Sequence, residues 1–182
     1  MKKGLKKVGF TLIELLISIS IMAIIVGVFL TNYYGSEPQS QLINATSALM
    51  RDLRLAQTRG VANVNYGSTP SSGWGVNLVS GTSTYFLFAD VNGDYVYNTS
   101  TESSTSKGAR TLTLPTGITL AHDLSSDPMN IVFYHSSDVF KTFLNDASRP
   151  YVALLTITLT EANTGAVKHV YVDPYGLIYS DL

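Results

Sequence analysis

The sequence predicts an α+β protein. A long N-terminal helix, membrane-spanning in its first half, is expected to pack on a C-terminal antiparallel β domain. Three features of the 182-residue chain support this prediction. An apolar run lies near the N-terminus, a helical pattern follows it, and short β-branched and aromatic runs separated by turn residues fill the rest.

The composition allows a sizeable core and restricts the chemistry. Apolar residues make up 45% of the chain, and the absence of cysteine excludes disulfides, thiolate metal sites and a cysteine nucleophile. Four of the 12 basic residues lie in the first nine positions, whereas all 13 acidic residues follow, so the remainder carries a net charge of −5. Because an acidic body is a poor match for phosphates, we expect no nucleic-acid partner.

The apolar run extends from Phe10 to Leu30, and its only formal charge is Glu14. A helix of this length covers about 31 Å, enough to cross a bilayer core. The lysines before it favour a cytoplasmic N-terminus, which places the β domain on the far side of the membrane. A secretory signal peptide and a plain membrane anchor are the alternatives, and neither accounts for a carboxylate in the apolar run.

The start of this run, "KKVGFTLIELL", resembles the processing site of the type IV pilin and pseudopilin superfamily. The resemblance implies that a prepilin peptidase cuts between Gly9 and Phe10, and that the new N-terminal Phe10 is methylated. It also implies that Glu14 pairs with the N-terminal amine of a neighbouring subunit during assembly on an inner-membrane platform. A paired carboxylate recovers part of the cost of burial in lipid, so Glu14 is interpreted as the mark that sets subunit register.

A second helical pattern follows the apolar run. Gly35 and Pro38 interrupt helix propensity, Ser36 with Gln39 resembles a capping box, and Gly60 predicts the helix end. The two helical parts are expected to form one long, kinked helix, as the pilin resemblance also implies. Apolar residues at three- and four-residue spacing predict a face that packs on the sheet, namely Leu42, Ala45, Leu49, Leu53 and Ala56. Arg51, Arg54 and Arg59 lie beside this face and are interpreted as a solvated side of the helix.

The remainder of the chain predicts an antiparallel β domain with polar loops at 66–73 and 98–108. Turns are expected at Asn163-Thr164-Gly165 and at Pro174-Tyr175-Gly176. The expected strands are "WGVNLV", "TYFLFAD", "RTLTL", "NIVFYH", "DVFKTF", "VALLTITLT", "VKHVYVD" and "GLIY". The predicted organisation is a leader at 1–9, a transmembrane and filament-core helix at 10–34, its amphipathic continuation at 35–60 and the β domain at 61–182.

Residues 42–120 resemble the H-type minor pseudopilins of type II secretion and the related FimT-like minor pilins. The resemblance rests on the helix "LMRDLRLAQTRGVANV", on "GWGVNL", on "YFLFADVNGDYVYN" and on "LPTGI". It implies a minor subunit at or near a filament tip, in contact with other major and minor pseudopilins or pilins. The basic tail of DNA-binding relatives is missing, since the chain ends "GLIYSDL".

Asp90, Asn92 and Asp94 form the sharpest local motif. Oxygens at alternate positions of a curled loop bind Ca²⁺ in many proteins, so these three residues are the candidate ligands. An EF-hand loop requires glycine at its sixth position, where this chain has Tyr95. The alternative is an Asn-Gly hairpin turn with acidic flanks.

No motif for catalysis is present: the chain lacks a G-x-S-x-G elbow, a P-loop and a dinucleotide-binding glycine pattern. The sequence therefore indicates a filament subunit rather than an enzyme. An exported Ca²⁺- or ligand-binding domain on a plain anchor is the alternative from another class, and it would need no cut after Gly9. An anchored hydrolase is disfavoured, because no nucleophile and base can be assembled.

Overall fold

The structure, a computed structural model, describes residues 10–136, 139–144 and 154–181. The chain divides into two compact units, Met1–Glu37 and Pro38–Leu182. Helix α1 (Leu12–Val61) supplies the described part of the first unit and continues into the second. The remaining elements are β1 (Gly73–Leu78), β2 (Thr84–Asp90), α2 (Thr99–Glu102), the 3-10 helix η1 (Thr105–Lys107), β3 (Arg110–Thr113), β4 (Ile118–His122), β5 (Met129–Ser136), β6 (Val139–Leu144), β7 (Leu155–Glu161), β8 (Val167–Val172) and β9 (Ile178–Ser180).

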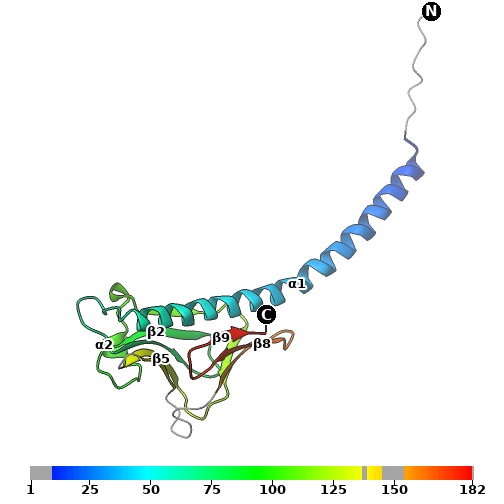
Figure 1. Cartoon of the computed structure of the whole chain (residues 1–182). Coiled ribbons are helices and arrows are strands. Elements are labelled where there is room, and N and C mark those ends of the chain that lie inside the picture. The colour runs from blue at the N-terminus through cyan, green and yellow to red at the C-terminus, as the bar shows by residue number, and fades with distance from the viewer. Residues whose placement is uncertain (1–9, 137–138, 145–153, 182) are drawn as a thin grey trace, which may run out of the picture. The chain divides into compact units, whose positions relative to one another are not determined.

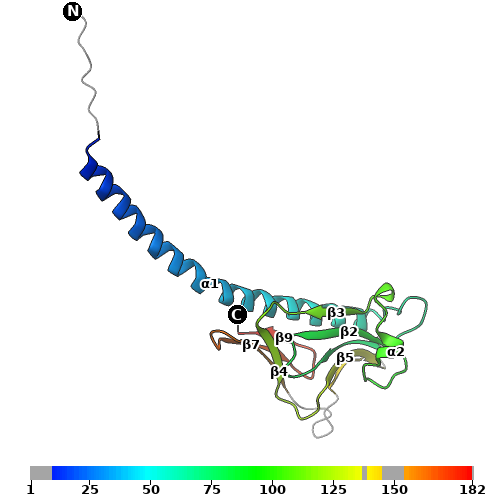
Figure 2. The same cartoon turned by 180° about the vertical axis from the view of Figure 1, so that it is seen from behind.

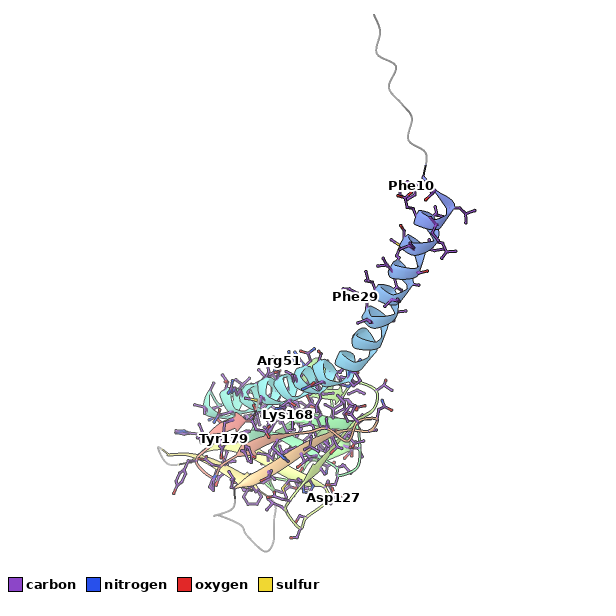
Figure 3. All side chains as sticks on the ribbon, turned by 90° about the vertical axis from the view of Figure 1, so that its right-hand side faces the viewer. Phe10, Phe29, Arg51, Asp127, Lys168 and Tyr179 are labelled. Atoms are coloured by element: carbon purple, nitrogen blue, oxygen red, sulfur yellow. The ribbon has the colours of Figure 1, made fainter. Side chains whose placement is uncertain are left out.

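The first unit contains the apolar helix. Residues Leu12–Leu30 have a mean hydropathy of 2.7 and are long and apolar enough to cross a membrane by length and composition. Every described side chain from Phe10 to Leu30 is exposed, and Figure 3 shows Phe10 and Phe29 projecting from the ribbon. Such a surface requires lipid or other helices around it, because exposing this much apolar area to water is unfavourable.

Helix α1 is continuous across the predicted break. Residues 36–39 are helical and Pro38 lies inside α1, so no helix begins at Ser36 and the predicted capping box with Gln39 is wrong. Pro38 lacks the N–H that a helix-interior residue donates, although its ring fixes a helical φ.

The second unit places the rest of α1 on two antiparallel sheets. One sheet has the order β3-β2-β1-β5-β6 and the other the order β4-β7-β8-β9. An isolated bridge between Thr82 and Leu120 joins the two sheets. In Figures 1 and 2 the cyan part of α1 runs along β2 and β9, which are strands of different sheets.

The predicted apolar face of α1 forms the centre of the core. Its members are at most 2% exposed, which confirms the face of Leu42, Ala45, Leu49, Leu53 and Ala56. The end of α1 approaches β5 closely: a Cβ added at Gly60 would lie 2.2 Å from the carbonyl oxygen of Phe133. The absence of a side chain at Gly60 therefore allows helix and sheet to meet here.

The arginines beside this face differ from one another. Arg51 is exposed, whereas Arg54 donates to the carbonyl oxygen of Ile178 at 3.2 Å. Arg59 donates to the carbonyl oxygen of Gly108 at 2.8 Å and lies 4.5 Å above the ring of Trp74. The interpretation of a solvated helix side is therefore right for Arg51 and Arg54, which are exposed, and wrong for the half-buried Arg59. Both Arg54 and Arg59 nevertheless connect α1 to the β domain.

Each expected strand has a counterpart, and both predicted turns are present. Two elements depart from the prediction. Strand β4, "ITLAH", was not expected, and the predicted polar loop at 98–108 contains α2 and η1. In that segment Glu102 is fully buried.

Candidate functional site

The N-terminus of α1 is capped by the residues of the candidate assembly site. Glu14 Oε2 accepts hydrogen bonds from the backbone N–H of Thr11 at 3.1 Å and from its hydroxyl at 2.8 Å. In return, Thr11 Oγ1 accepts from the backbone N–H of Glu14 at 3.3 Å. This reciprocal pattern is a capping box with Thr11 at the N-cap and Glu14 at the third helical position.

The capping box gives Glu14 a local role inside the apolar segment. A helix start leaves backbone N–H groups without helical partners, which is costly where water is scarce. Glu14 places an acceptor beside them, and its charge lies at the positive end of the helix dipole. A carboxylate can accept about four hydrogen bonds, so the two from Thr11 leave capacity for a cation of another subunit.

The other polar side chains of this segment are also satisfied locally. Ser18 donates to the carbonyl oxygen of Glu14 at 2.7 Å, and Ser20 donates to that of Leu16 at 2.8 Å. The segment therefore presents an apolar surface with one carboxylate at its start. Of the two residues at the expected cut, Phe10 is 78% exposed and Gly9 lies outside the described residues.

Sequence reasoning singled out Glu14 but missed Thr11. The signal was available, since Thr-x-x-Glu before an apolar run is the pattern of a capping box. The pilin-like motif accounted for Glu14 without reference to its neighbours, and the capping role of Thr11 follows only from the geometry.

The candidate Ca²⁺ ligands lie in a turn whose oxygens accept internal hydrogen bonds. Asp90 is fully buried, and its carboxylate accepts from the N–H groups of Gly93 at 2.7 Å and Tyr95 at 3.3 Å. Asp94 accepts from the side-chain amide of Asn92 at 2.7 Å and from the N–H of Val96 at 2.8 Å. Asn92 Oδ1 in turn accepts from the N–H of Asp94 at 3.2 Å.

Glu102, which follows the motif in the sequence and was not among its candidate ligands, belongs to the same cluster. Its two carboxylate oxygens accept from the N–H groups of Val91 at 3.0 Å and Asn98 at 2.8 Å. Burial raises the pKa of both Glu102 and Asp90 above the usual range, and the backbone hydrogen bonds oppose that rise. Glu102 thus holds the two ends of the segment from Val91 to Asn98, and Asp90 holds its middle.

This segment covers the face of the five-stranded sheet opposite α1. Tyr97 stacks on Phe86 at a centroid distance of 5.2 Å, and Tyr95 lies 4.7 Å from Phe143 and 4.9 Å from Tyr134. The face is set by alternation, since Tyr85, next to Phe86, points the other way and donates to Asp52 of α1. The geometry therefore supports a structural role for the turn.

Calcium binding by Asp90, Asn92 and Asp94 stays a prediction. Among the described residues, no three histidine, aspartate or glutamate side chains gather as a metal site. A titration followed by thermal unfolding tests the prediction. Ligation by this turn would raise Tm at millimolar Ca²⁺, and Asp94→Asn would remove the rise; an unchanged Tm would contradict it.

Comparison with known proteins bears on the N-terminus. Residues 8–30 match the family model described as the prokaryotic N-terminal methylation motif. This match supports a place in the type IV pilin and pseudopilin superfamily and processing by prepilin peptidase. The matched motif is a pilin-type structural motif and does not define an enzyme family. No curated protein and no solved structure matches the chain.

The fold agrees with this assignment. An apolar N-terminal helix followed by an antiparallel β domain is the pilin-like α+β arrangement. The apolar helix and the motif together fit a membrane-anchored protein that assembles with other pilins.

Proposed function

We propose that this chain is a minor pseudopilin of a type II secretion pseudopilus, assembled at or near the filament tip to support protein secretion. The observation that carries the proposal is the start of α1. There, Glu14 is held by Thr11 near the start of the apolar segment from Phe10 to Leu30, in which every side chain is exposed. In the membrane, lipid can cover such a helix, and in a filament, neighbouring helices can do so.

Two further observations support the minor-subunit role. The segment 42–120, which resembles H-type minor pseudopilins, forms a continuous part of the second unit, from α1 through β4. The body is also acidic, which makes it a poor match for the phosphates of DNA. We therefore propose other pseudopilins, the prepilin peptidase and an inner-membrane assembly platform as its partners.

The mature N-terminus tests the proposal directly. We expect the intact mass and N-terminal sequence of the protein, extracted from its native membrane, to show a chain that begins at N-methylated Phe10. A chain that still begins at Met1 while the peptidase is present would make the first 30 residues a plain anchor. It would also favour an exported binding domain over a filament subunit.

A minor type IV pilin that primes pilus assembly for adhesion, motility or DNA uptake is the second candidate, because the N-terminal motif serves both machines. Deleting the gene separates the two. A pseudopilin deletion reduces the export of folded proteins and leaves surface pili intact, whereas a pilin deletion removes the pili and leaves export unchanged.

A further inference from the structure

The turn between β8 and β9 exposes two large apolar side chains. Tyr175 is 87% exposed and Leu177 is 59% exposed, more than any other large apolar side chain described from Pro38 onward. We call residues Asp173 to Ile178 the Tyr175 turn. Single exposed apolar residues are common on protein surfaces, so exposure alone does not indicate a binding site.

The Tyr175 turn is held rigidly by its own hydrogen bonds. Asp173 Oδ1 accepts from the backbone N–H groups of Tyr175 at 2.9 Å and Leu177 at 2.7 Å. The N–H of Asp173 donates to the carbonyl oxygen of Leu177 at 3.1 Å, and Gly176 has a φ of 83°, which suits glycine. A turn that is already ordered loses little conformational entropy when a partner covers it.

Helix α1 anchors this turn from outside. Gln57 Nε2 donates to the carbonyl oxygen of Gly176 at 2.6 Å, and Arg54 Nη2 donates to that of Ile178 at 3.2 Å. The turn is therefore fixed at both its centre and its end, and Tyr175 and Leu177 project from a rigid support.

A pocket lies along the same helix. Its volume is about 290 Å³, and Ser47, Met50, Arg51 and Arg54 line it. We call it the arginine pocket. The side chain of Arg51 is 74% exposed, and Figure 3 shows it on the side of α1 away from the strands. Arg51 Nε lies 3.6 Å from the buried carboxylate of Asp52, and most of the Arg51 side chain stays exposed. Together with Arg54, a hydroxyl and an apolar wall, it suits a carboxylate side chain, because arginine binds carboxylates with paired hydrogen bonds.

Arg54 belongs to both features, since it lines the pocket and bonds to the last residue of the turn. Ser47 and Gln57, at the two ends, lie ten residues apart on α1, which corresponds to about 15 Å along the helix. One partner surface can therefore cover the turn and the pocket together.

We propose that the Tyr175 turn and the arginine pocket form one docking surface for a neighbouring filament subunit that presents an apolar recess beside an exposed carboxylate. Tyr175 and Leu177 enter the recess, and the carboxylate enters the pocket between Arg51 and Arg54. A symmetric contact with a second copy is disfavoured, because it would bring the arginines of the two copies together. The inference rests on the proposed function in taking the partner to be a filament subunit.

Site-specific photo-crosslinking tests this surface in the full-length protein in its native cells. A benzophenone amino acid replaces Tyr175 in one strain and Val167, an exposed residue of β8, in a control strain. We expect position 175 to yield one discrete adduct with another filament subunit, and the control position to yield at least about tenfold less of it.

Charge reversal then tests the pocket. Arg51→Glu should lower the adduct yield at position 175 about tenfold, since it places a carboxylate where the partner's carboxylate binds. Arg110→Glu, the same change at an exposed residue of β3, should leave the yield unchanged. An unchanged Tm confirms that Arg51→Glu leaves the fold intact. Replacing the partner's carboxylate residue with lysine should then restore the adduct in the Arg51→Glu strain.

Several outcomes overturn the inference: adducts with lipid alone, adducts only with a second copy, or a yield that Arg51→Glu does not change. If Phe10 is the mature N-terminus and the chain enters the filament but position 175 gives no adduct, the surface is wrong and the proposed function stands. If the chain is uncut and the charge-dependent adduct forms with an acidic protein outside any filament, the surface stands without the proposed function.

Discussion

At the scale of single residues, Glu14 combines helix capping with a charge in an apolar segment. The substitution Glu14→Ala removes both hydrogen bonds from Thr11 and the negative charge that would pair with the amine of a neighbouring subunit. We expect membrane insertion to persist, because the rest of the segment is apolar, and incorporation into the filament to fall at least about tenfold. Quantifying the protein in membranes and in sheared filaments measures the two steps separately.

Ser20→Ala is the matched control for this change. It removes a polar group from the same helix, but the Ser20 hydroxyl bonds only locally, to the carbonyl oxygen of Leu16, and it carries no charge. Its incorporation should equal that of the wild type. Wild-type incorporation of Glu14→Ala itself would show that the carboxylate is not needed for assembly.

Thr11 allows the capping role of Glu14 to be separated from its charge. Thr11→Val keeps the shape of the side chain and removes the hydroxyl bonds to Glu14, while the carboxylate stays in place. The loss of one side-chain cap costs about 1 kcal/mol. We therefore expect the amount of Thr11→Val in the filament to lie between the amounts of the wild type and of Glu14→Ala. A defect as large as that of Glu14→Ala would indicate that Thr11 acts as more than a cap.

At the scale of secondary-structure elements, the contact between the end of α1 and β5 depends on Gly60. A methyl group there would lie 2.2 Å from the carbonyl oxygen of Phe133, and backbone atoms on both sides leave little room to adjust. Gly60→Ala should therefore lower the free energy of unfolding by at least about 2 kcal/mol, although alanine favours helix. Thermal unfolding measured by circular dichroism gives the change.

Gly27→Ala serves as the control, since an added Cβ there meets nothing within 4 Å and the residue is also helical. It should leave the unfolding of the β domain unchanged. An equal loss in both variants would mean that the effect arises from helix propensity rather than from the close approach to β5.

The elements that were predictable from the sequence are those whose signals are local. The buried face of α1 repeats at helical spacing from Leu42 to Ala56, and the turn at Gly165 has its own turn residues. Strand β4 was missed because it is short and directly follows a Pro-Thr-Gly turn. Its buried residues Ile118 and Leu120 alternate with exposed ones, and its pairing with β7, such as Leu120 with Leu159, identifies it as a strand.

The candidate sites were likewise predictable only where their signals are local in the sequence. Phe10 and Glu14 follow from a specific contiguous motif, and residues 8–30 match a family model. The buried carboxylate of Glu102, by contrast, accepts from the backbone N–H of Val91, eleven residues away. Arg54 and Arg59 of α1 donate to the carbonyl oxygens of Ile178 and Gly108, which are still farther away in the sequence. Charged side chains in helices and polar loops are usually solvated, so a sequence pattern alone does not reveal these hydrogen bonds.

At the scale of the whole molecule, two sets of carboxyl groups give stability opposite dependences on pH. Burial raises the pKa of Asp90 and Glu102, so their ionisation destabilises the fold as pH rises above the ordinary values of 3.8 and 4.5. Hydrogen bonds from the Thr164 hydroxyl and from the N–H groups of Asn163 and Thr164 lower the pKa of Glu161. Its stabilisation is therefore present above 4.5 and is lost as pH falls through the lowered pKa. We expect Tm to be highest under mildly acidic conditions.

Two matched variants test this origin of the pH dependence. Glu102→Gln cannot ionise at this position, so it should flatten the fall in Tm above about pH 4.5, and Glu161→Gln should flatten the fall below about pH 4.5. Each amide also loses one acceptor oxygen that faces a backbone N–H group, of Asn98 or of Thr164, which lowers Tm at every pH. The slope of Tm against pH therefore measures ionisation, whereas its absolute value measures the lost hydrogen bond. A wild-type slope above pH 4.5 in Glu102→Gln would place the titrating group elsewhere and leave Glu102 with a purely structural role in holding the turn over the sheet.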